Sequence, residues 1–552
     1  MKVIIIGGVA GGMSAATRLR RLDDQAEIIV LEKSGFVSYA NCGLPYFVGG
    51  VIEEESSLLL QTPSSLFERF RIDVRVNNEA TSIDPAVKTV TVRDWLTGET
   101  DVLTYDYLVL SPGASPVVPP LAGIELALPL RTVEDVERIA AAVLEQPRHA
   151  VVIGGGFIGV EIAENLMRRG IATSIVEASD QVLAPLDPEM AQLVAEELVH
   201  QGVSLHLKDS VTRVTKSFVE LSSGMVLNAD LVIVSIGVRP EVGLARAAGL
   251  TVGERGGIVV DKFNRTSDTS IYAIGDAAEK RDAVDASATL VPLANIANHQ
   301  GRIVADHICG RAVRPRATIG TSIVKVFDLT IAVTGWNEKR LKAQGRPVVV
   351  IHTHPSSHAG YYPGAKPMSL KLLVDPVTGV ILGAQGVGTD GVDKRIDVIA
   401  TAIFAGLTAP DLADLELAYA PPFGSAKDPV NMLGYVAENL LTGLSESIQW
   451  NEVESYRLRG ASFIDVRTQE EFAQGSLPGA VNIPLDELRL RLDEVKSNDV
   501  IVNCQVGQRG HVATLLLRQH GYNARNLDGG YETWLHSPGS SSVELVGSST
   551  TK

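Results

Sequence analysis

The sequence predicts a multidomain α/β protein with two βαβ units, an α+β domain built on an antiparallel sheet, and a separate C-terminal α/β domain. Three observations support this prediction. A glycine-rich turn joins a strand to a helix twice, at residues 7–12 and again at 154–159. Apolar and polar residues alternate within 321–385, and βα repeats begin again from Asn451. A chain of 552 residues is long enough for several domains.

Composition excludes several functional classes. A net charge of −16 argues against a general nucleic-acid binder, which would show a basic stripe. Three cysteines are no disulfide framework and favour a reducing compartment, so we expect a cytoplasmic protein. Glycines break the apolar start MKVIIIGGVAGG, which we interpret as a buried strand and not as a signal peptide. No apolar run reaches the roughly 18 residues of a membrane span.

The first βαβ unit occupies the start of the chain. Residues 2–6 (KVIII) form the expected strand, the turn 7–12 opens a helix, and a second strand, 27–31, is followed by Glu32. An acid about 20 residues after such a turn is typical of a dinucleotide-binding fingerprint. The fingerprint is imperfect, because Val9 stands where the middle glycine belongs. The additional glycines of the turn compensate for it in our interpretation.

The second unit repeats the pattern in full register. AVVIGGGFIGVEIAENL supplies Gly154, Gly156 and Gly159, and the strand TSIVE ends at Glu177. One such turn alone is weak evidence. Two complete βαβ units, each with its own acid, predict two nucleotide sites.

The segments between and after these units extend the prediction. YDYLVLSPGASP (105–116) indicates a strand that runs into a Pro-Gly turn, and SDTSIYAIGDAAE (267–279) a strand that ends at Gly275 and Asp276. Residues 321–385 predict an antiparallel sheet, with helices following to about residue 443.

The C-terminal part predicts an independent α/β domain of ~90 residues. TGLSESIQ is interpreted as a linker. After it come a strand ASFIDVR, a helix EEFAQG, a strand AVNIP, a helix LDELRLRLDEV and a strand DVIVNC. The tail SPGSSSVELVGSSTTK is polar and is expected to be disordered.

One cysteine dominates the chemistry that the sequence indicates. Cys42 lies in SYANCGLPY, a few residues after the first βαβ unit, with no second cysteine near it. A lone thiol can attack a disulfide or a persulfide, but it cannot pair with a neighbour. Cys309, in the helix-like ADHICGRA, is interpreted as a core residue, whereas Cys504 belongs to the C-terminal domain.

These motifs carry a family resemblance. GGVAGG, LEK, SYANCGLPY, GGGFIG and YAIGD, in this order, resemble the FAD-dependent pyridine nucleotide-disulfide oxidoreductases over residues 1 to about 445. Within that family the chain is similar to the single-cysteine branch of coenzyme A (CoA) disulfide reductases and NADH oxidases or peroxidases. It resembles above all the CoA-disulfide reductases fused to a rhodanese domain, which include NADH-dependent persulfide reductases.

The resemblance implies an α/β fold with two Rossmann-like nucleotide-binding domains (FAD and NAD), an α+β dimerisation domain and a C-terminal rhodanese α/β domain. The boundaries that we expect are 1–115 with 268–320 for the FAD domain, 116–267 for the NAD(P)H domain, 321–445 for the dimerisation domain, 446–540 for the rhodanese domain and 541–552 for the tail.

FAD is expected in the first unit and NADH in the second. The pyrophosphate of each would lie at a helix N-terminus, where free N–H groups and the helix dipole favour anions. No arginine follows Glu177, which favours NADH while leaving NADPH open. Phe157 is either an aromatic gate near the nicotinamide or a packed core residue. The cofactor-binding residues that the resemblance implies are Gly7, Gly8, Gly11, Gly12, Glu32, Lys33, Gly154, Gly156, Gly159, Glu177, Gly275, Asp276 and Tyr419.

The resemblance also implies CoA as substrate or tightly bound ligand. Ser14, Arg18 and Arg21 share one helix face, so the two arginines are expected to grip CoA phosphates. A solvated basic face is the alternative interpretation. In the family, tyrosines enter the site from the partner subunit, which implies a homodimer with shared active sites. Further expected CoA contacts are Ser38, Asn41, Asn298, Tyr361, Tyr362 and Lys427.

The C-terminal motif C-Q-V-G-Q-R resembles a rhodanese loop. It runs from Cys504 to Arg509 between a strand and a helix, and both are expected to be catalytic. Such a loop can direct backbone N–H groups at a thiolate or persulfide. A phosphatase loop would place five residues, not four, between its cysteine and arginine. Asp465 and Arg467 resemble structural anchors of that fold.

The histidines 352, 354 and 358 raise the question of a metal. Because no cysteine or acid lies near them in the sequence, we expect a solvated loop and no metal site.

The function that follows is a reductase. Electrons would pass from NADH through FAD to Cys42 and reduce CoA disulfide, CoA persulfide or polysulfide, while Cys504 carries sulfane sulfur. Two alternatives stay open. One is an NADH oxidase or peroxidase with a sulfenic acid at Cys42, and the other is a flavin redox sensor in which the rhodanese docks a partner.

Overall fold

The computed structural model describes residues 1–538 and 540. They form two compact units, which we describe separately: residues 1–178 with 209–320, and residues 179–208 with the chain from 321 onward. The tail expected to be disordered, 541–552, lies outside the described residues. No helix among the described residues is both long and apolar enough to cross a membrane.

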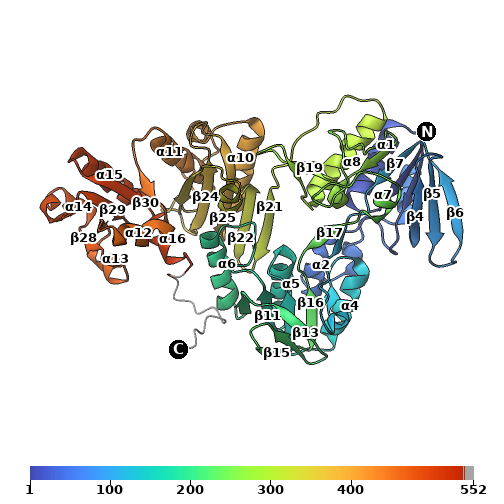
Figure 1. The fold of residues 1–552 in the computed structure, drawn as a ribbon, viewed down its shortest axis with the longest axis horizontal. Helices are drawn as coiled ribbons and strands as arrows, with labels where there is room; N and C mark the ends of the chain where they lie inside the picture. Colours follow the sequence, from blue (N-terminus) through green and yellow to red (C-terminus); the bar gives the residue numbers. More distant parts are fainter. Residues whose placement is uncertain (539, 541–552) are drawn as a thin grey trace. The chain divides into compact units, whose positions relative to one another are not determined.

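The first unit contains a five-stranded parallel sheet in the order β18-β7-β1-β2-β3, of which β7 is labelled in Figure 1. Its strands are β1 (Lys2–Ile6), β2 (Glu27–Leu31), β3 (Asp73–Arg75), β7 (Tyr107–Leu110) and β18 (Ile271–Ala273). Successive residues of a strand point to opposite faces. Val3 and Ile5 therefore pack against α1 (Ala10–Leu22), while Ile4 and Ile6 pack toward an antiparallel layer. The first predicted strand–turn–helix–strand is confirmed.

Further sheets and several helices belong to this unit, two of which sheets matter for the site. The antiparallel layer comprises β4 (Asn78–Asp84), β5 (Thr89–Asp94) and β6 (Thr100–Thr104). A second parallel sheet runs β11-β10-β16-β9, namely Ala172–Glu177, His149–Ile153, Leu231–Val234 and Leu128–Pro129. The helices that the site uses are α2 (Leu44–Val48), α5 (Phe157–Arg168) and α8 (Ala294–Ile308). Helix α8 packs along α1.

The second unit contains the predicted antiparallel sheet, in the order β21-β22-β25-β24-β23. Its strands are Ser322–Val326, Leu329–Gly335, Ile381–Gly388, Met368–Val374 and Val349–Thr353. Helices α10 (Val392–Ala405) and α11 (Pro429–Leu441) share one core with it. Helices α6 (Pro188–His200) and α9 (Glu338–Ala343) belong to the same unit.

The C-terminal domain has a parallel sheet in the order β26-β30-β29-β27-β28. These strands are Ser447–Ile448, Asn523–Leu527, Asp499–Asn503, Ser462–Asp465 and Val481–Asn482. Helices α13 (Gln469–Ala473), α15 (Gln508–Gln519) and α16 (Gly530–Leu535) flank the Cys504 loop described below.

Two details of this domain differ from the prediction. The end of the predicted linker pairs as β26 with β30, because its backbone completes the sheet edge. The single helix expected over LDELRLRLDEV is instead α14 (Leu485–Leu488) and a 3-10 turn at Leu492–Glu494.

Candidate active site

The turn after β1 forms a backbone cradle. Gly7 has φ +100°, and a Cβ there would lie 2.0 Å from the Ser111 carbonyl oxygen. A Cβ on Gly12 would lie 1.9 Å from the Gly7 oxygen. Val9, the N-cap of α1, makes no side-chain capping hydrogen bond. The first N–H groups of α1 therefore have no side-chain cap, and this glycine-rich cradle fits the pyrophosphate of FAD.

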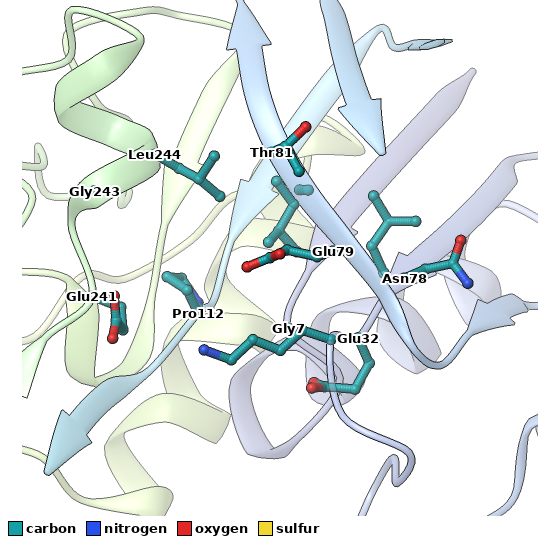
Figure 2. Close-up of a pocket in the computed structure, with 13 residues that line it drawn as sticks. Gly7, Glu32, Asn78, Glu79, Thr81, Pro112, Glu241, Gly243 and Leu244 are labelled. Atoms are coloured by element: carbon teal, nitrogen blue, oxygen red, sulfur yellow. The ribbon is translucent and has the colours of Figure 1, made fainter. Parts of the chain in front are cut away.

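A cavity of about 410 Å³ adjoins this turn (Figure 2). Glu32, 8% exposed, lies at its edge, and one carboxylate oxygen accepts the Gly8 N–H at 2.8 Å. The carboxylate thus ties the end of β2 to the turn, where the adenosine ribose is expected. Lys33 also lines the cavity. Lining residues that the sequence prediction missed are Asn78, Glu79, Thr81, Glu241 and Leu244, which no motif marks.

The second turn repeats this arrangement. Gly154 has φ +108°, and a Cβ on Gly159 would lie 2.0 Å from the Gly154 oxygen. Gly156 caps α5 without a side chain, and Gly155 N–H donates to Glu177 at 2.7 Å. This second turn therefore fits the pyrophosphate of NAD(P)H as the first turn fits that of FAD. Phe157 is the first residue of α5 and is partly exposed.

The turn after β18 places Asp276 beside two cations. Gly275, with φ +68°, donates its N–H to Gln300 at 2.8 Å. The Lys280 ammonium donates to the carbonyl oxygens of Gly275 and Ala278 at 2.5 and 2.9 Å. Burial lowers the pKa of Lys280 to about 8. Arg131 lies 3.6 Å from the Asp276 carboxylate. The sequence prediction identified neither Lys280 nor Arg131, since each lies outside the YAIGD motif.

Cys42 lies in a 3-10 turn, Asn41–Gly43, just before α2, and its residue is exposed. Burial of the sulfur raises the pKa of the thiol, and the charges of Glu161 and Asp276 raise it further. Asp276 is thus close enough to act on Cys42 electrostatically, although the two lie far apart in sequence. The thiol and the expected flavin ligand therefore share one neighbourhood.

Glu161 and Tyr46 form a second pair beside this thiol. The Tyr46 hydroxyl, on α2, donates to a Glu161 carboxylate oxygen, on α5, at 3.0 Å. Burial raises the pKa of Glu161 to about 7, with Glu164 adding to the rise. A carboxyl group that titrates near neutrality can exchange a proton with a sulfur site. Its position two residues after Gly159 was the only available signal in the sequence.

The predicted CoA residues of the first unit lie on α1, α8 and the Cys42 turn. Ser14 donates to Asn298 at 2.7 Å, which joins two of them. Arg18 forms two hydrogen bonds, of 2.9 and 2.7 Å, with Asp306, while Arg21 is exposed. Ser38 (φ +50°) and Asn41 flank Cys42.

In the second unit the predicted aromatic residues are exposed. The hydroxyls of Tyr361 and Tyr419 lie 2.8 Å apart. Tyr362 meets the His358 ring edge-on, with centroids 5.7 Å apart. The Lys427 ammonium lies 5.9 Å from the Tyr435 ring centre.

The Cys504 loop connects β29 to α15, as predicted. Cys504 is fully buried, and Gly507, with φ +91°, caps α15. The loop rests on Gly530, where a Cβ would lie 2.6 Å from the Cys504 carbonyl oxygen. Within the described part of the chain, the N–H groups of residues 505–510 donate to no backbone or side-chain acceptor. They are therefore available to an anionic sulfur.

Two arginines border this loop. Arg509 pairs with Glu471 through two hydrogen bonds of 2.7 and 2.6 Å. Arg467 is buried against both oxygens of Asp465 and donates to Gln505 at 3.0 Å. Asp465 and Arg467 thus anchor the loop from within the fold.

The expectation of a solvated histidine loop is wrong. His352 lies on β23 and is 4% exposed, with its ring between Asp528 (2.6 Å) and Glu189 (3.0 Å). Hydrogen bonds to these acids raise the pKa of His352 to about 9 against the opposing effect of burial. His358 is also buried. The acids come from distant parts of the chain, so the sequence could not show them.

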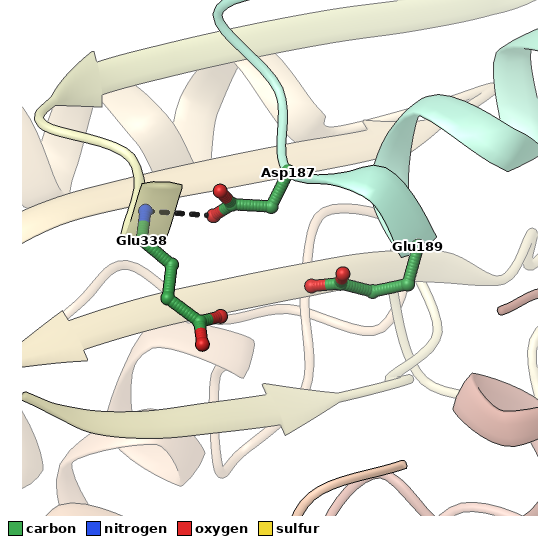
Figure 3. A group of neighbouring side chains, drawn as sticks. All are labelled: Asp187, Glu189 and Glu338. Carbon is green, nitrogen blue, oxygen red and sulfur yellow. Dashed lines mark hydrogen bonds between the residues drawn. The ribbon is translucent and has the colours of Figure 1, made fainter. Parts of the chain in front are cut away.

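Three carboxylates nearby, those of Asp187, Glu189 and Glu338, converge closely enough to hold a metal ion (Figure 3). The buried Lys371 ammonium lies among them, at 3.0, 2.5 and 2.6 Å respectively. It supplies the positive charge that a metal would bring, so the cluster is an internal ion-pair network.

Comparison with known proteins agrees with this geometry. The family model described as "Pyridine nucleotide-disulphide oxidoreductase" matches residues 1–301. The model of the dimerisation domain of that family matches 321–429, and the model described as "Rhodanese-like domain" matches 449–537. The coenzyme A disulfide reductase of Staphylococcus epidermidis is 34% identical over 439 residues, which are 79% of this chain and all of that protein.

Two solved structures cover both units. Reduced CoADR-RHD of Bacillus anthracis has a TM-score of 0.96 and 49% identity, over 97% of this chain and 98% of that one. The NAD-dependent persulfide reductase from A. fulgidus has a TM-score of 0.91 and 39% identity, over 97% and 100%. The α/β fold with two nucleotide-binding units, a dimerisation domain and a rhodanese domain is confirmed, as is dependence on FAD and NAD(P)H. The chain belongs to the pyridine nucleotide-disulphide oxidoreductase family.

Proposed function

We propose that the chain is an NAD(P)H-dependent reductase of CoA disulfide and of CoA-bound persulfide. One observation carries the proposal: Cys42 is a lone exposed thiol within electrostatic reach of Asp276. The names of the relatives in Staphylococcus epidermidis and A. fulgidus support the substrate class.

In this proposal Cys42 acts as the nucleophile. Its thiolate attacks one sulfur of the substrate, the S–S bond breaks, and one thiolate leaves while a mixed disulfide forms on Cys42. A bound FAD would supply this disulfide with two electrons from NAD(P)H, so that Cys42 and the second product would be recovered as thiolates. Glu161 is within electrostatic reach of Cys42. Because its pKa is raised to about 7, it can supply a proton to the departing thiolate.

CoA binding would use the polar groups near Cys42. Ser14 and Asn298 already contact each other, and Arg21 is exposed on the same helix as Ser14. Arg18, whose Nε and one terminal nitrogen both donate to one oxygen of Asp306, would exchange this carboxylate for a CoA phosphate oxygen.

The dimerisation domain indicates a homodimer. We propose that Tyr361 and Tyr419, paired through their hydroxyls, act at the partner's active site, since both are exposed on their own subunit. Three free cysteines fit a reducing cytoplasm. The domain boundaries that we expect from the sequence are also part of this proposal.

Cys504 is proposed to carry sulfane sulfur as a persulfide. The free N–H groups of residues 505–510 support this role, because they can stabilise a charged sulfur inside a buried loop.

Steady-state oxidation of NADH tests the proposal. The acceptors are CoA disulfide, CoA persulfide, polysulfide, oxygen and hydrogen peroxide, with free CoA present or absent. We expect kcat/KM for CoA-bound acceptors to exceed that for oxygen and peroxide by at least about a hundredfold, since CoA binding energy aligns the sulfur with Cys42. Fastest turnover with oxygen or peroxide, indifferent to CoA, would instead establish the oxidase or peroxidase alternative.

A further inference from the structure

We propose that Glu471 determines which sulfur donors the Cys504 site accepts. The site takes sulfane sulfur from a thiol-borne persulfide and discriminates against a small dianionic donor such as thiosulfate. This inference rests on the proposed role of Cys504 as sulfane-sulfur carrier. Glu471 is a positioning residue, because it acts through Arg509.

The Arg509–Glu471 pair lies at the Cys504 loop. Arg509 is the second residue of α15, and Glu471 lies in the first turn of α13. Hydrogen bonding to Glu471 is the largest cause that raises the pKa of Arg509, and the Cys504 thiol contributes through its charge and a hydrogen bond. Arg509 therefore pairs with the acid and interacts electrostatically with the Cys504 sulfur.

The Arg509–Glu471 pair occupies the side-chain donors of Arg509 that an incoming anion would otherwise use. Both terminal nitrogens of Arg509 already donate to Glu471. The bond to Arg509 lowers the pKa of Glu471 to about 2, so the acid stays ionised at neutral pH. A dianion entering here would meet an arginine whose charge is compensated and a carboxylate that repels it.

The other charges that reach the loop are compensated too. Arg467 is paired with Asp465. Gln505 donates to Glu532 at 2.8 Å, and Glu532 lies 3.4 Å from His536, which is also paired with Glu196. The remaining side chains of the motif, Val506 and Gln508, carry no charge. Among the described contacts of the loop there is no surplus of positive charge to offset the desolvation of a dianion.

A thiol-borne persulfide avoids this penalty. The Cys504 thiolate attacks its outer sulfur, the donor's S–S bond breaks, and the donor leaves as a thiolate with the electron pair. The outer sulfur keeps its proton and becomes bonded to Cys504. In CoA persulfide the phosphates lie at the far end of the pantetheine arm from the reacting sulfur. With thiosulfate the same attack expels sulfite, and two negative charges must enter the loop.

Single-turnover loading of the holoenzyme tests the inference. Wild-type protein and Glu471→Gln are mixed separately with CoA persulfide and with thiosulfate, and Cys504 persulfide is quantified by mass spectrometry of the peptide. Glutamine keeps one oxygen as acceptor for the Thr468 N–H, and it removes the charge together with one of the two acceptors of Arg509. We expect Glu471→Gln to raise the ratio of thiosulfate to persulfide loading by at least about tenfold, because Arg509 gains a free charge.

Two variants assign the effect to this pair. Adding Arg509→Gln to Glu471→Gln should abolish the gain with thiosulfate. Glu470→Gln, a change at the exposed neighbouring residue, should leave both loading rates as in wild type. Melting temperatures confirm folding. If Glu471→Gln does not fold, the wild-type ratio decides, since thiosulfate loading as fast as persulfide loading contradicts the inference.

The outcomes separate this inference from the proposed function. An unchanged ratio in folded Glu471→Gln, with persulfide loading intact, removes the role of Glu471 and leaves Cys504 as carrier. Loading of wild-type Cys504 from neither donor removes the carrier role, and the inference falls with it.

Discussion

The two cysteines that we propose to be reactive occupy opposite environments. Cys42 is exposed in a short turn, and the charges that act on it are the acids Glu161 and Asp276. Cys504 is fully buried in a loop of free N–H groups, within electrostatic reach of Arg509. An exposed thiol suits exchange with a substrate that arrives and leaves, whereas its raised pKa keeps the resting thiol mostly protonated. A buried sulfur among N–H groups suits storage of a charged persulfide.

The largest expected effect is the loss of reduction on removing the exposed thiol. Cys42→Ser should lower NADH-dependent turnover of CoA disulfide by at least about a thousandfold, because the nucleophile is gone. FAD content, measured by absorbance, should be unchanged. Cys309→Ser, at the half-buried end of α8, is the control. Substantial turnover of CoA disulfide by Cys42→Ser would contradict the role of Cys42 as the nucleophile.

The next largest effect concerns the separate roles of Cys42 and Cys504. Cys504→Ser should lower polysulfide-dependent turnover by about tenfold or more while sparing CoA-disulfide reduction, because only the former needs a sulfane-sulfur carrier. Both rates are measured by NADH oxidation at saturating cofactor. Equal losses on the two substrates would show that Cys504 and Cys42 act as one site.

A stability prediction concerns the unit that holds Cys504. His352→Gln should lower the free energy of unfolding by about 3 kcal/mol at pH 7, since Glu189 and Asp528 lose a buried cation. The pKa of His352 is raised to about 9 in the folded protein. Its contribution is therefore present below the ordinary value near 6.5 and is lost as the pH rises through 9.

Thermal melting at pH 7 and pH 10 measures this effect. The gap in melting temperature between wild type and His352→Gln should narrow at the higher pH. A gap that is constant across this range would mean that the charge of His352 contributes nothing.

The smallest expected effect concerns the acids around Cys42. Glu161→Gln should lower the pKa of the thiol, since Glu161 raises it, although burial, the largest cause, persists. The thiolate fraction at pH 7 then grows, and alkylation of Cys42 by iodoacetamide should accelerate by about two- to fivefold. Glu137→Gln, at an exposed residue of the same unit, serves as the control. Slower alkylation would contradict the assigned electrostatics.

Local sequence patterns predicted the parts of the fold and site that depend on neighbouring residues. Both glycine turns, the acids Glu32 and Glu177 that bond to them, and the Cys504 loop follow from short motifs. The motif at Cys42 likewise identified the thiol, but not the groups around it. The rest depends on contacts between distant segments.

Those contacts explain what the sequence could not show. Glu161 and Tyr46 are 115 residues apart, and His352 and Asp528 are 176 apart, so no spacing rule connects them. His352 was expected in solvent because its acids are remote in sequence. The sequence likewise did not predict that Arg18 pairs with Asp306, because Arg18 lies on α1 and Asp306 lies on α8.

Trapping CoA on the purified protein tests most directly whether substrate sulfur is bound at Cys42. Protein equilibrated with CoA disulfide is digested without reductant, and the peptides of Cys42, Cys309 and Cys504 are analysed by mass spectrometry before and after one equivalent of NADH. The proposal predicts CoA on Cys42 and its release as thiol by NADH. CoA found only on another cysteine, or a Cys42 oxidised by oxygen and never bound to CoA, would contradict it.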